Sequence, residues 1–222
     1  MTEPTYDART RYQDGAEVRQ FEAARYSSAL GRARLAGERR AVRRVLDGLA
    51  AADCILDCPC GIGRWTPVLG ARARRIVGLD ISAPMLERAR KEQAIRFPLS
   101  LARAEAERLP LVDGCVDYVF CYALMKHLPP EIKRTVLSEF ARVARRGMVV
   151  SFAVFNPLTY LRWRWMQWRE RRRKQAPVHS YPVWPKELDD LAHETGLRVG
   201  RRAGVLGWLS LEKVVHLEKV VL

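Results

Sequence analysis

The sequence predicts an α/β protein with a doubly wound, mostly parallel sheet of seven strands, helices on both faces and a terminal antiparallel strand. Apolar runs of strand length alternate with helical segments along most of the 222 residues, and such alternation implies right-handed crossovers between parallel strands. The run Val116–Cys121 is continuous in apolar character, as expected of a strand buried on both faces. The last two runs are joined by a loop too short for a crossover helix, so we expect them to pair antiparallel.

The elements of the N-terminal half follow from periodicity and capping signals. The region from about Ala16 to Leu49 has an arginine-rich helical pattern that Gly31 and Gly37 are expected to break into pieces. Ser82 is placed to cap a helix whose first turn contains Pro84. The remaining predictions here are strand Cys54–Cys58, helix Arg64–Gly70, strand Arg75–Leu79, a helix from Ser82 to Gln93, and strand Leu99–Ala102.

The C-terminal half continues the same alternation and then departs from it. We predict strand Val116–Cys121, helix Pro130–Arg145, strand Met148–Val154, helix Pro185–Glu194 and the final strands Leu197–Arg202 and Ser210–Leu222. About thirty residues, 155–184, separate strand Met148–Val154 from the next helix, more than a simple connection needs. We therefore expect residues 51–222 to form the main domain, with an insertion at 155–184, and residues 1–50 to form an N-terminal helical cap.

Composition limits the class of protein. Hydrophobic residues make up 48% of the chain, which is typical of a globular protein. No apolar run approaches the roughly 20 residues that cross a bilayer, and the first residues do not resemble a signal peptide. Five cysteines, three of them crowded at 54, 58 and 60, suggest reduced thiols. We expect a cytoplasmic protein, and its net charge of +14 favours anionic partners such as nucleic acid, anionic lipid or phosphorylated metabolites.

A glycine-bearing turn is the most informative local feature. The strand that begins at Cys54 runs into a turn with Gly61 and Gly63, and the next strand ends in Asp80. This combination is how an α/β sheet holds an adenosine. The third glycine of a dinucleotide fingerprint is replaced by Thr66, and a phosphate-binding loop would need lysine where Arg64 stands. The alternative is a purely structural strand–helix turn.

Five segments in series resemble the class I S-adenosylmethionine-dependent methyltransferases, close to the subgroup that methylates small molecules and quinones. They are Leu56–Gly63, Val77–Ser82, Ala104–Leu111, Asp117–Cys121 with His127–Pro129, and Val143–Gly147. Together they cover about residues 52–154 in the order and spacing of that family. Pro59 departs from the pattern, because the family usually has glycine there and proline removes a backbone donor. The resemblance implies a Rossmann-like fold and S-adenosylmethionine as cofactor.

The resemblance also implies which residues contact that cofactor. The implied set is Asp57, Gly61, Gly63, Asp80, Ile81, Met85, Glu105, Ala106 and Cys121. In this scheme Asp57 acts on the ammonium end, directly or through water, and Asp80 accepts both ribose hydroxyls. Ile81 and Met85 pack on the adenine, Glu105 accepts from its amino group, and the Ala106 amide faces the ring.

The implied reaction needs little chemistry from the protein. The sulfonium methyl is already activated, so the enzyme mainly positions the acceptor, and a base is needed only for a protonated acceptor. His127 is the candidate base, with a structural role in its turn as the alternative. Tyr26, His179 and Tyr181 are candidates for the acceptor pocket, to which the N-terminal cap should contribute. No metal site is predicted, because the Cys58/Cys60 spacing suits zinc poorly.

The insertion contains a basic, tryptophan-rich helix. Leu158, Leu161, Trp165 and Trp168 fall on one helical face, and the cationic run Arg169–Lys174 follows. One interpretation is a lid helix whose tryptophans pack on the sheet. A second is a helix at an anionic membrane surface, on the inner face of the membrane, which would give access to a lipid-borne acceptor. The predicted function is methyl transfer to a small-molecule or lipid-like acceptor, on oxygen, nitrogen or carbon; the alternative is an RNA methyltransferase or RNA-binding protein that uses the same segment.

Overall fold

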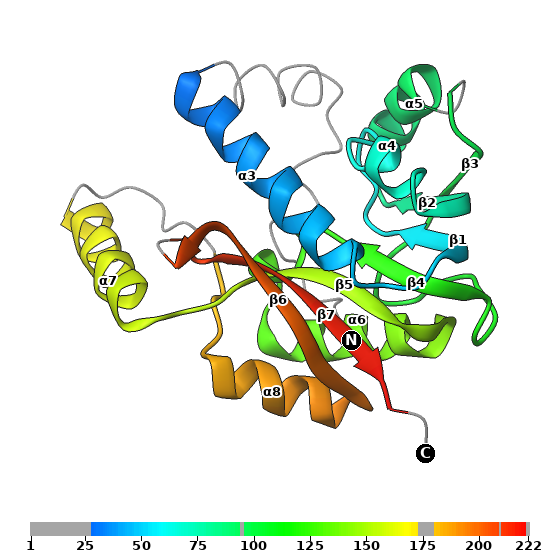
Figure 1. The fold of residues 1–222 in the computed structure, drawn as a ribbon. Coiled ribbons are helices and arrows are strands. Elements are labelled where there is room, and N and C mark those ends of the chain that lie inside the picture. Colours follow the sequence, from blue (N-terminus) through cyan, green and yellow to red (C-terminus); the bar gives the residue numbers. More distant parts are fainter. Residues whose placement is uncertain (1–27, 94–95, 173–179, 209, 221–222) are drawn as a thin grey trace.

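A seven-stranded sheet in the order β3-β2-β1-β4-β5-β7-β6 forms the centre of the molecule (Figure 1). The computed structural model describes residues 28–93, 96–172, 180–208 and 210–220. The strands are β1 Ala52–Asp57, β2 Ala73–Asp80, β3 Leu99–Arg103, β4 Val116–Cys121, β5 Ala144–Ala153, β6 Leu197–Trp208 and β7 Glu212–Lys219. The predicted α/β class is confirmed.

The last strand in the chain is antiparallel to both of its neighbours. β1 to β5 pair in parallel, whereas β7 pairs antiparallel with β5 on one side and with β6 on the other. The predicted antiparallel pairing of the two terminal strands is confirmed. The insertion of β7 between β5 and β6 was not predicted, and β6 extends to Trp208, well beyond the predicted end at Arg202.

Helices cover both faces of the sheet. They are α3 Ala29–Leu46, α4 Thr66–Leu69, α5 Ala83–Glu92, the 3₁₀ turn η1 Met125–His127, α6 Pro130–Val143, α7 Pro157–Arg172 and α8 Pro185–Glu194. Apolar side chains of α3 and α4 pack in one core cluster, and those of α6 and α8 pack in a second cluster on the other face of the sheet. β4 lies between the two clusters and is buried along its whole length, as its apolar run predicts.

The predicted breaks at Gly31 and Gly37 are wrong, because α3 continues through both glycines. A Cβ atom at Gly37 would lie 2.4 Å from the carbonyl oxygen of Val205 in β6, so glycine allows the helix to approach the sheet closely. Ser28 caps the same helix by accepting a hydrogen bond from the Gly31 amide at 3.0 Å. Glycine therefore serves helix–sheet contact here, and tertiary packing outweighs its low helix propensity.

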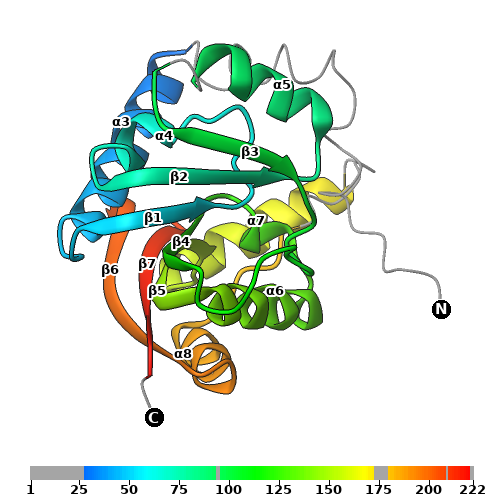
Figure 2. The same ribbon diagram turned by 90° about the vertical axis from the view of Figure 1, so that its right-hand side faces the viewer.

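Helix α7 lies beyond the end of the sheet rather than against one of its faces (Figures 1 and 2). It follows β5 directly, and the Asn156 side chain begins it by accepting from the Thr159 amide at 2.8 Å. The predicted helix in the insertion is therefore confirmed. None of the helices in the described ranges is long and apolar enough to cross a membrane.

The carboxyl ends of the parallel strands gather at one edge of the sheet. Asp57, Asp80 and Cys121 stand at the ends of β1, β2 and β4. Ligands of open α/β sheets bind at this edge, in the crevice between the loops that follow the carboxyl ends of the strands. The site is therefore built from these strand ends and the turns that follow them.

Candidate functional site

The turn after β1 is held between the two neighbouring strands. The Cys58 amide donates to the Phe120 carbonyl and the Cys60 amide donates to the Leu79 carbonyl, both at 2.9 Å. Gly61 and Gly63 have φ values of +54° and +75°, a backbone conformation that side chains disfavour. A Cβ atom at Gly61 would point into open space. The turn thus presents bare backbone at the edge of the sheet, which suits the close approach of a ligand.

Asp80 connects this turn to the next helix. One carboxylate oxygen accepts from the Gly61 amide at 2.8 Å, and the other accepts from the Ser82 amide at 2.9 Å. Burial raises the pKa of Asp80, while these backbone hydrogen bonds act to lower it. Ser82 in turn caps α5. Asp80 therefore holds both segments in place and retains lone pairs for further donors, as a carboxylate that binds two hydroxyl groups requires.

Asp57 is a buried carboxylate without a hydrogen-bond partner among the described residues. Its side chain is fully buried, and neither carboxylate oxygen accepts a bond. Burial, and secondarily the charge of Asp80, raise the pKa of Asp57 well above its usual range. A cationic group beside Asp57 would offset both the cost of burying its charge and the repulsion from Asp80. The ammonium end of S-adenosylmethionine is such a group, so the residues present fit this cofactor.

The residues expected around the adenine lie on the next two connections. Met85 in α5 is buried and packs with Ile62, while Ile81 is half-buried. Glu105 and Ala106 follow β3 in a turn that the Ala104 amide ties to the Asp80 carbonyl at 3.1 Å. These positions surround one side of the Asp80 turn. Their contacts with a cofactor remain predictions.

The cysteines near the site are buried thiols. Cys58, Cys60 and Cys121 are all buried, and desolvation raises the pKa of each thiol. A thiol held in its neutral form is a poor nucleophile and a poor metal ligand. Within the described part of the chain no group of three or more histidine, cysteine or acidic residues is arranged to hold a metal ion. Cys121 forms part of the core under the site.

A cavity of about 360 Å³ opens at the same edge of the sheet, beside the ends of β5 and β7. Its apolar wall comes from α7, β6 and the turn after β6: Trp163, Met166, Val205, Leu206 and Leu211. Its charged lining consists of Arg34, Lys126, Arg162 and Glu212. The cavity is large enough for a small molecule and combines apolar surface with few charges, as ligand sites commonly do.

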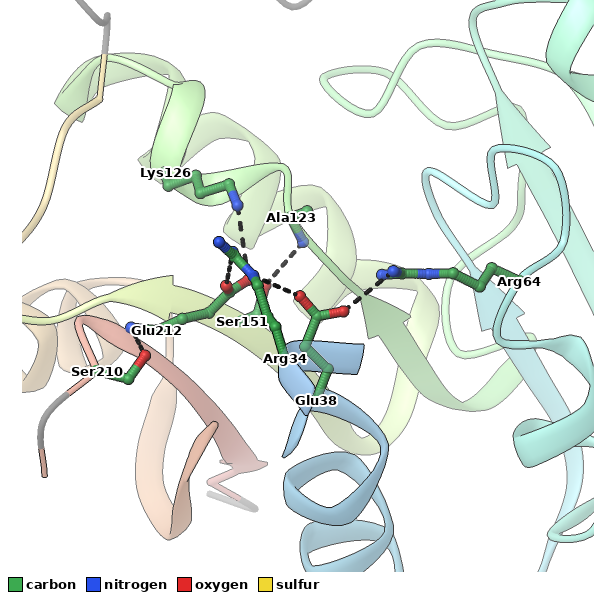
Figure 3. A network of polar contacts seen from close by, with 8 residues as sticks. All are labelled: Arg34, Glu38, Arg64, Ala123, Lys126, Ser151, Ser210 and Glu212. Carbon is green, nitrogen blue, oxygen red and sulfur yellow. Dashed lines mark hydrogen bonds and ion pairs between the residues drawn. The ribbon is translucent and has the colours of Figure 1, made fainter. Parts of the chain in front are cut away.

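A network of ion pairs connects this cavity to the glycine turn (Figure 3). Arg34 bonds Glu212 at 2.7 Å and Glu38 at 3.1 Å, and Arg64 bonds the second oxygen of Glu38 at 3.0 Å. The Lys126 Nζ atom lies 3.6 Å from Glu212. Glu38 is completely buried between the two arginines. The network fixes α3 to the turn that carries Gly61 and to the start of β7.

The aromatic residues beside Arg64 complete this region. The Arg64 guanidinium lies 4.8 Å from the ring centre of Trp65 and 5.3 Å from that of Tyr122. The Tyr122 hydroxyl is buried without a hydrogen-bond partner in the described residues. The next residue, Ala123, has a φ of +67° and donates to the Ser151 hydroxyl at 2.7 Å. Non-glycine residues in this conformation are uncommon and are concentrated at functional sites.

The acceptor residues predicted from sequence are only partly placed. His127 lies half-buried in η1 at the expected edge, but the cavity is lined by its neighbour Lys126. The Lys133 ammonium lies 5.8 Å from the ring centre of Tyr181. The cavity is lined by the preceding residue, Ser180, and not by Tyr181. Tyr26 and His179 are outside the described residues. Roles for these four residues stay predictions.

Several site residues were not predicted from the sequence: Arg34, Glu38, Arg64, Lys126 and Glu212. Arg34 and Glu38 are four residues apart on one helix, which is the spacing of a surface ion pair. Only the tertiary fold brings Arg64 and Glu212 to them. An acidic residue within an otherwise arginine-rich helix was the one available signal.

Comparison with known proteins agrees with this geometry. Residues 55–147 match a family described as a methyltransferase domain. The chain is 33% identical over 99 residues to a malonyl-[acyl-carrier protein] O-methyltransferase of Hamiltonella defensa, covering 45% of this chain and 36% of that protein. It is 34% identical over 105 residues to a demethylmenaquinone methyltransferase of Lactiplantibacillus plantarum, covering 45% and 44%. The chain thus spans less than half the length of these relatives.

The fold is shared with solved structures of methyltransferases. The magnesium protoporphyrin IX methyltransferase of Synechocystis with bound S-adenosylmethionine superimposes with a TM-score of 0.68 and 17% identity, over 99% of this chain and 100% of that chain. This likeness establishes the fold, and the matched domain contains the Asp57 and Asp80 turns described above. Residues 55–147 thus contain a methyltransferase domain, and the chain is similar in sequence and in fold to S-adenosylmethionine-dependent methyltransferases.

Proposed function

We propose that this protein transfers the methyl group of S-adenosylmethionine to a small, lipid-like acceptor that it meets at an anionic membrane surface. Asp57 and the turn at Gly61 would hold the methionine end of the cofactor, and Asp80 the ribose. When bound, the cofactor supplies an activated methyl group. The protein's own contribution is to position the acceptor and exclude water from the reacting atoms.

The arrangement of α7 carries the acceptor half of this proposal. One side of the helix, with Trp163 and Met166, lines the cavity. The other side exposes four large apolar side chains to solvent: Leu158 at 47%, Leu161 at 65%, Trp165 at 55% and Trp168 at 50%. The alternative that these tryptophans pack on the sheet is therefore wrong for Trp165 and Trp168.

Charges next to this apolar stripe favour a membrane over a protein partner. Arg169 lies over the Trp165 ring at 5.0 Å and Arg172 lies over the Trp168 ring at 4.1 Å. A helix with tryptophans and leucines on one face and flanking arginines is typical of segments that lie in the headgroup region of anionic bilayers. An acceptor leaving the bilayer would meet the cavity on the opposite face of the same helix.

The N-terminal cap is part of the same proposal. Arg34 in α3 lines the cavity, which supports a contribution of residues 1–50 to the acceptor pocket. Residues 155–184 would form its cover, because α7 supplies Arg162, Trp163 and Met166 to the cavity lining.

Vesicle binding tests the membrane surface. We expect the protein to sediment with vesicles of phosphatidylcholine and phosphatidylglycerol, and more weakly with phosphatidylcholine alone. Replacing Leu161, Trp165 and Trp168 together by serine should reduce this binding about 10- to 100-fold, because each substitution removes apolar area from the contact between α7 and the bilayer. Added salt should weaken binding by screening the arginines.

A matched control is Val112→Ser, since Val112 is an even more exposed apolar residue, at 74%, but lies outside α7. It should leave vesicle binding unchanged. Equal binding by the triple variant would contradict the membrane proposal. A salt-sensitive shift with RNA in the absence of vesicle binding would favour the RNA alternative instead.

His127 is proposed as the general base for an acceptor that arrives protonated. His127→Ala should then lower kcat about 100-fold, the usual contribution of general-base catalysis, and should change KM little. His127→Gln should not restore the rate. Full turnover by His127→Ala would eliminate this role and leave the histidine as a structural residue of η1.

A further inference from the structure

The charges that line the cavity are unequal in number. Three cations, Arg34, Lys126 and Arg162, face one carboxylate, Glu212. Glu38, outside the lining, is shared between Arg34 and Arg64, so the carboxylates around the cavity still leave an excess of positive charge among the described residues. Because Arg162 is exposed, this positive charge is accessible to an anionic ligand that enters from solvent.

Arg162 is the cation that carries this excess. Arg34 is held by Glu212 and Glu38, and Lys126 is within ion-pair distance of Glu212. Arg162 has no carboxylate partner in the described ranges and lies on the side of α7 that lines the cavity. Its planar guanidinium offers paired donors, which match a carboxylate or phosphate group better than any neutral ligand.

The apolar wall lies beside this cation. Trp163 and Met166 are one and four residues from Arg162 on the same helix, and Leu206 faces the cavity from β6. An acceptor that satisfies both surfaces needs a negatively charged end and an apolar body. It would also be attracted by the arginines of α7 before it entered.

We infer that the acceptor is an anionic amphiphile, whose carboxylate or phosphate group binds Arg162 next to Lys126 while its apolar part lies against Trp163, Met166 and Leu206. This inference rests on the proposed function and narrows it to one class of acceptor. It does not assign the atom that receives the methyl group. The charged end is a recognition group held at the cavity wall.

Chain-matched probes test this directly. We would titrate the full-length protein with octanoate, octyl phosphate, octanol and octyltrimethylammonium by calorimetry, all below the concentrations at which they aggregate. At least one of the two anions should bind about ten-fold or more tightly than octanol, as expected for one charge-assisted pair, and the cation should bind most weakly. The stronger of the two anions identifies carboxylate or phosphate.

Two variants locate the effect. Arg162→Gln should remove the preference for the anion, with an approximately ten-fold loss in anion affinity and little change for octanol. Arg164→Gln is the matched control, because Arg164 is an exposed arginine on the same helix but outside the cavity lining. It should keep the preference. Equal affinity for anion and octanol, or an anion preference that survives Arg162→Gln, would overturn the inference.

The result separates this inference from the proposed function. Cofactor binding and vesicle binding without any preference for anionic probes would refute the anionic acceptor alone. Preference for the anions in a protein that does not bind S-adenosylmethionine would leave the cavity assignment standing and refute methyl transfer.

Discussion

Replacing Asp80 by Asn is expected to weaken S-adenosylmethionine binding by at least about 100-fold. Both carboxylate oxygens accept backbone hydrogen bonds, from Gly61 and Ser82. An asparagine can accept at only one of these positions and must point its amide group at the other donor. The loss combines one or two charge-assisted bonds, each worth about 1.5–3 kcal/mol, with a disturbed turn at Gly61. Equilibrium dialysis with labelled cofactor measures the change.

The control for Asp80 is Glu87→Ala. Glu87 is an exposed acid on α5 that pairs with Lys91 at 2.7 Å, and it lies a few residues beyond the Ser82 cap. The Glu87→Ala variant lacks one negative charge in the same neighbourhood, and its turn at Gly61 is unaltered. Its affinity for S-adenosylmethionine should equal that of the wild type. An unchanged affinity in Asp80→Asn would contradict the ribose role of Asp80.

Asp57→Asn is expected to have opposite effects on stability and on cofactor binding. Because burial raises the pKa of Asp57, the stability it contributes is fully present below about pH 4 and is lost as the pH rises through its raised folded-state pKa. Asparagine carries no charge, so the variant should be more stable than wild type near neutral pH, by about 1–3 kcal/mol. The same change should weaken binding of the cationic cofactor about 10- to 100-fold.

The pH dependence distinguishes this explanation from general damage. Urea unfolding without cofactor should show an advantage of Asp57→Asn that grows from about pH 5 to pH 8, since only the wild-type carboxylate ionises. Cofactor affinity of the wild type should rise over the same range and that of the variant should not. A variant less stable than wild type at neutral pH would contradict the description of Asp57 as an unpaired buried acid.

Asp117→Asn provides the matched control for Asp57. Asp117 is also a buried strand acid, but it accepts from the amides of Asp53 and Cys54 and pairs with Arg145 at the opposite end of the strands. Burial acts to raise its pKa, but the hydrogen bonds and the nearby arginines lower it overall. Near neutral pH, Asp117→Asn should therefore lower the free energy of unfolding, whereas Asp57→Asn should raise it. Asp117→Asn should leave the affinity for the cofactor unchanged.

The cofactor half of the site could be predicted from sequence because its residues lie close together in the chain. The turn at Gly61 and the acid Asp80 follow consecutive strands, and parallel strands bring their carboxyl ends to one edge. Local turn chemistry therefore determined the geometry. The buried and unpaired state of Asp57 could not be predicted, because it depends on the strands on either side of it, β2 and β4, which follow later in the chain.

The acceptor half depends on contacts between distant segments. Glu212 reaches Arg34 across 178 residues, and it does so because β7 inserts between β5 and β6. Periodicity placed two strands at the C-terminus but contained no signal for their order in the sheet. The predicted break at Gly37 failed for the same reason, since the carbonyl of Val205 that requires a glycine there comes from β6.

The composition of α7 was informative only in part. Leu158, Leu161, Trp165 and Trp168 were correctly placed on one face, but the sequence could not decide whether that face meets the sheet or solvent. Trp163, off that face, packs against Phe155 with ring centres 5.4 Å apart and lines the cavity. Phe155, two residues beyond β5, contacts the rings of Tyr160 and Trp163 on the side of the helix that faces the protein.

The most direct measurement follows a labelled methyl group. The protein is incubated with S-adenosylmethionine labelled in its methyl group and with an extract of the cells from which it derives, and the products are separated and analysed by mass spectrometry. We expect label in an acidic, lipid-soluble small molecule, formed by wild type and by Glu87→Ala but not by Asp80→Asn. Label in nucleic acid, or no transfer of label by the wild-type protein, would contradict methyl transfer to a lipid-like acceptor.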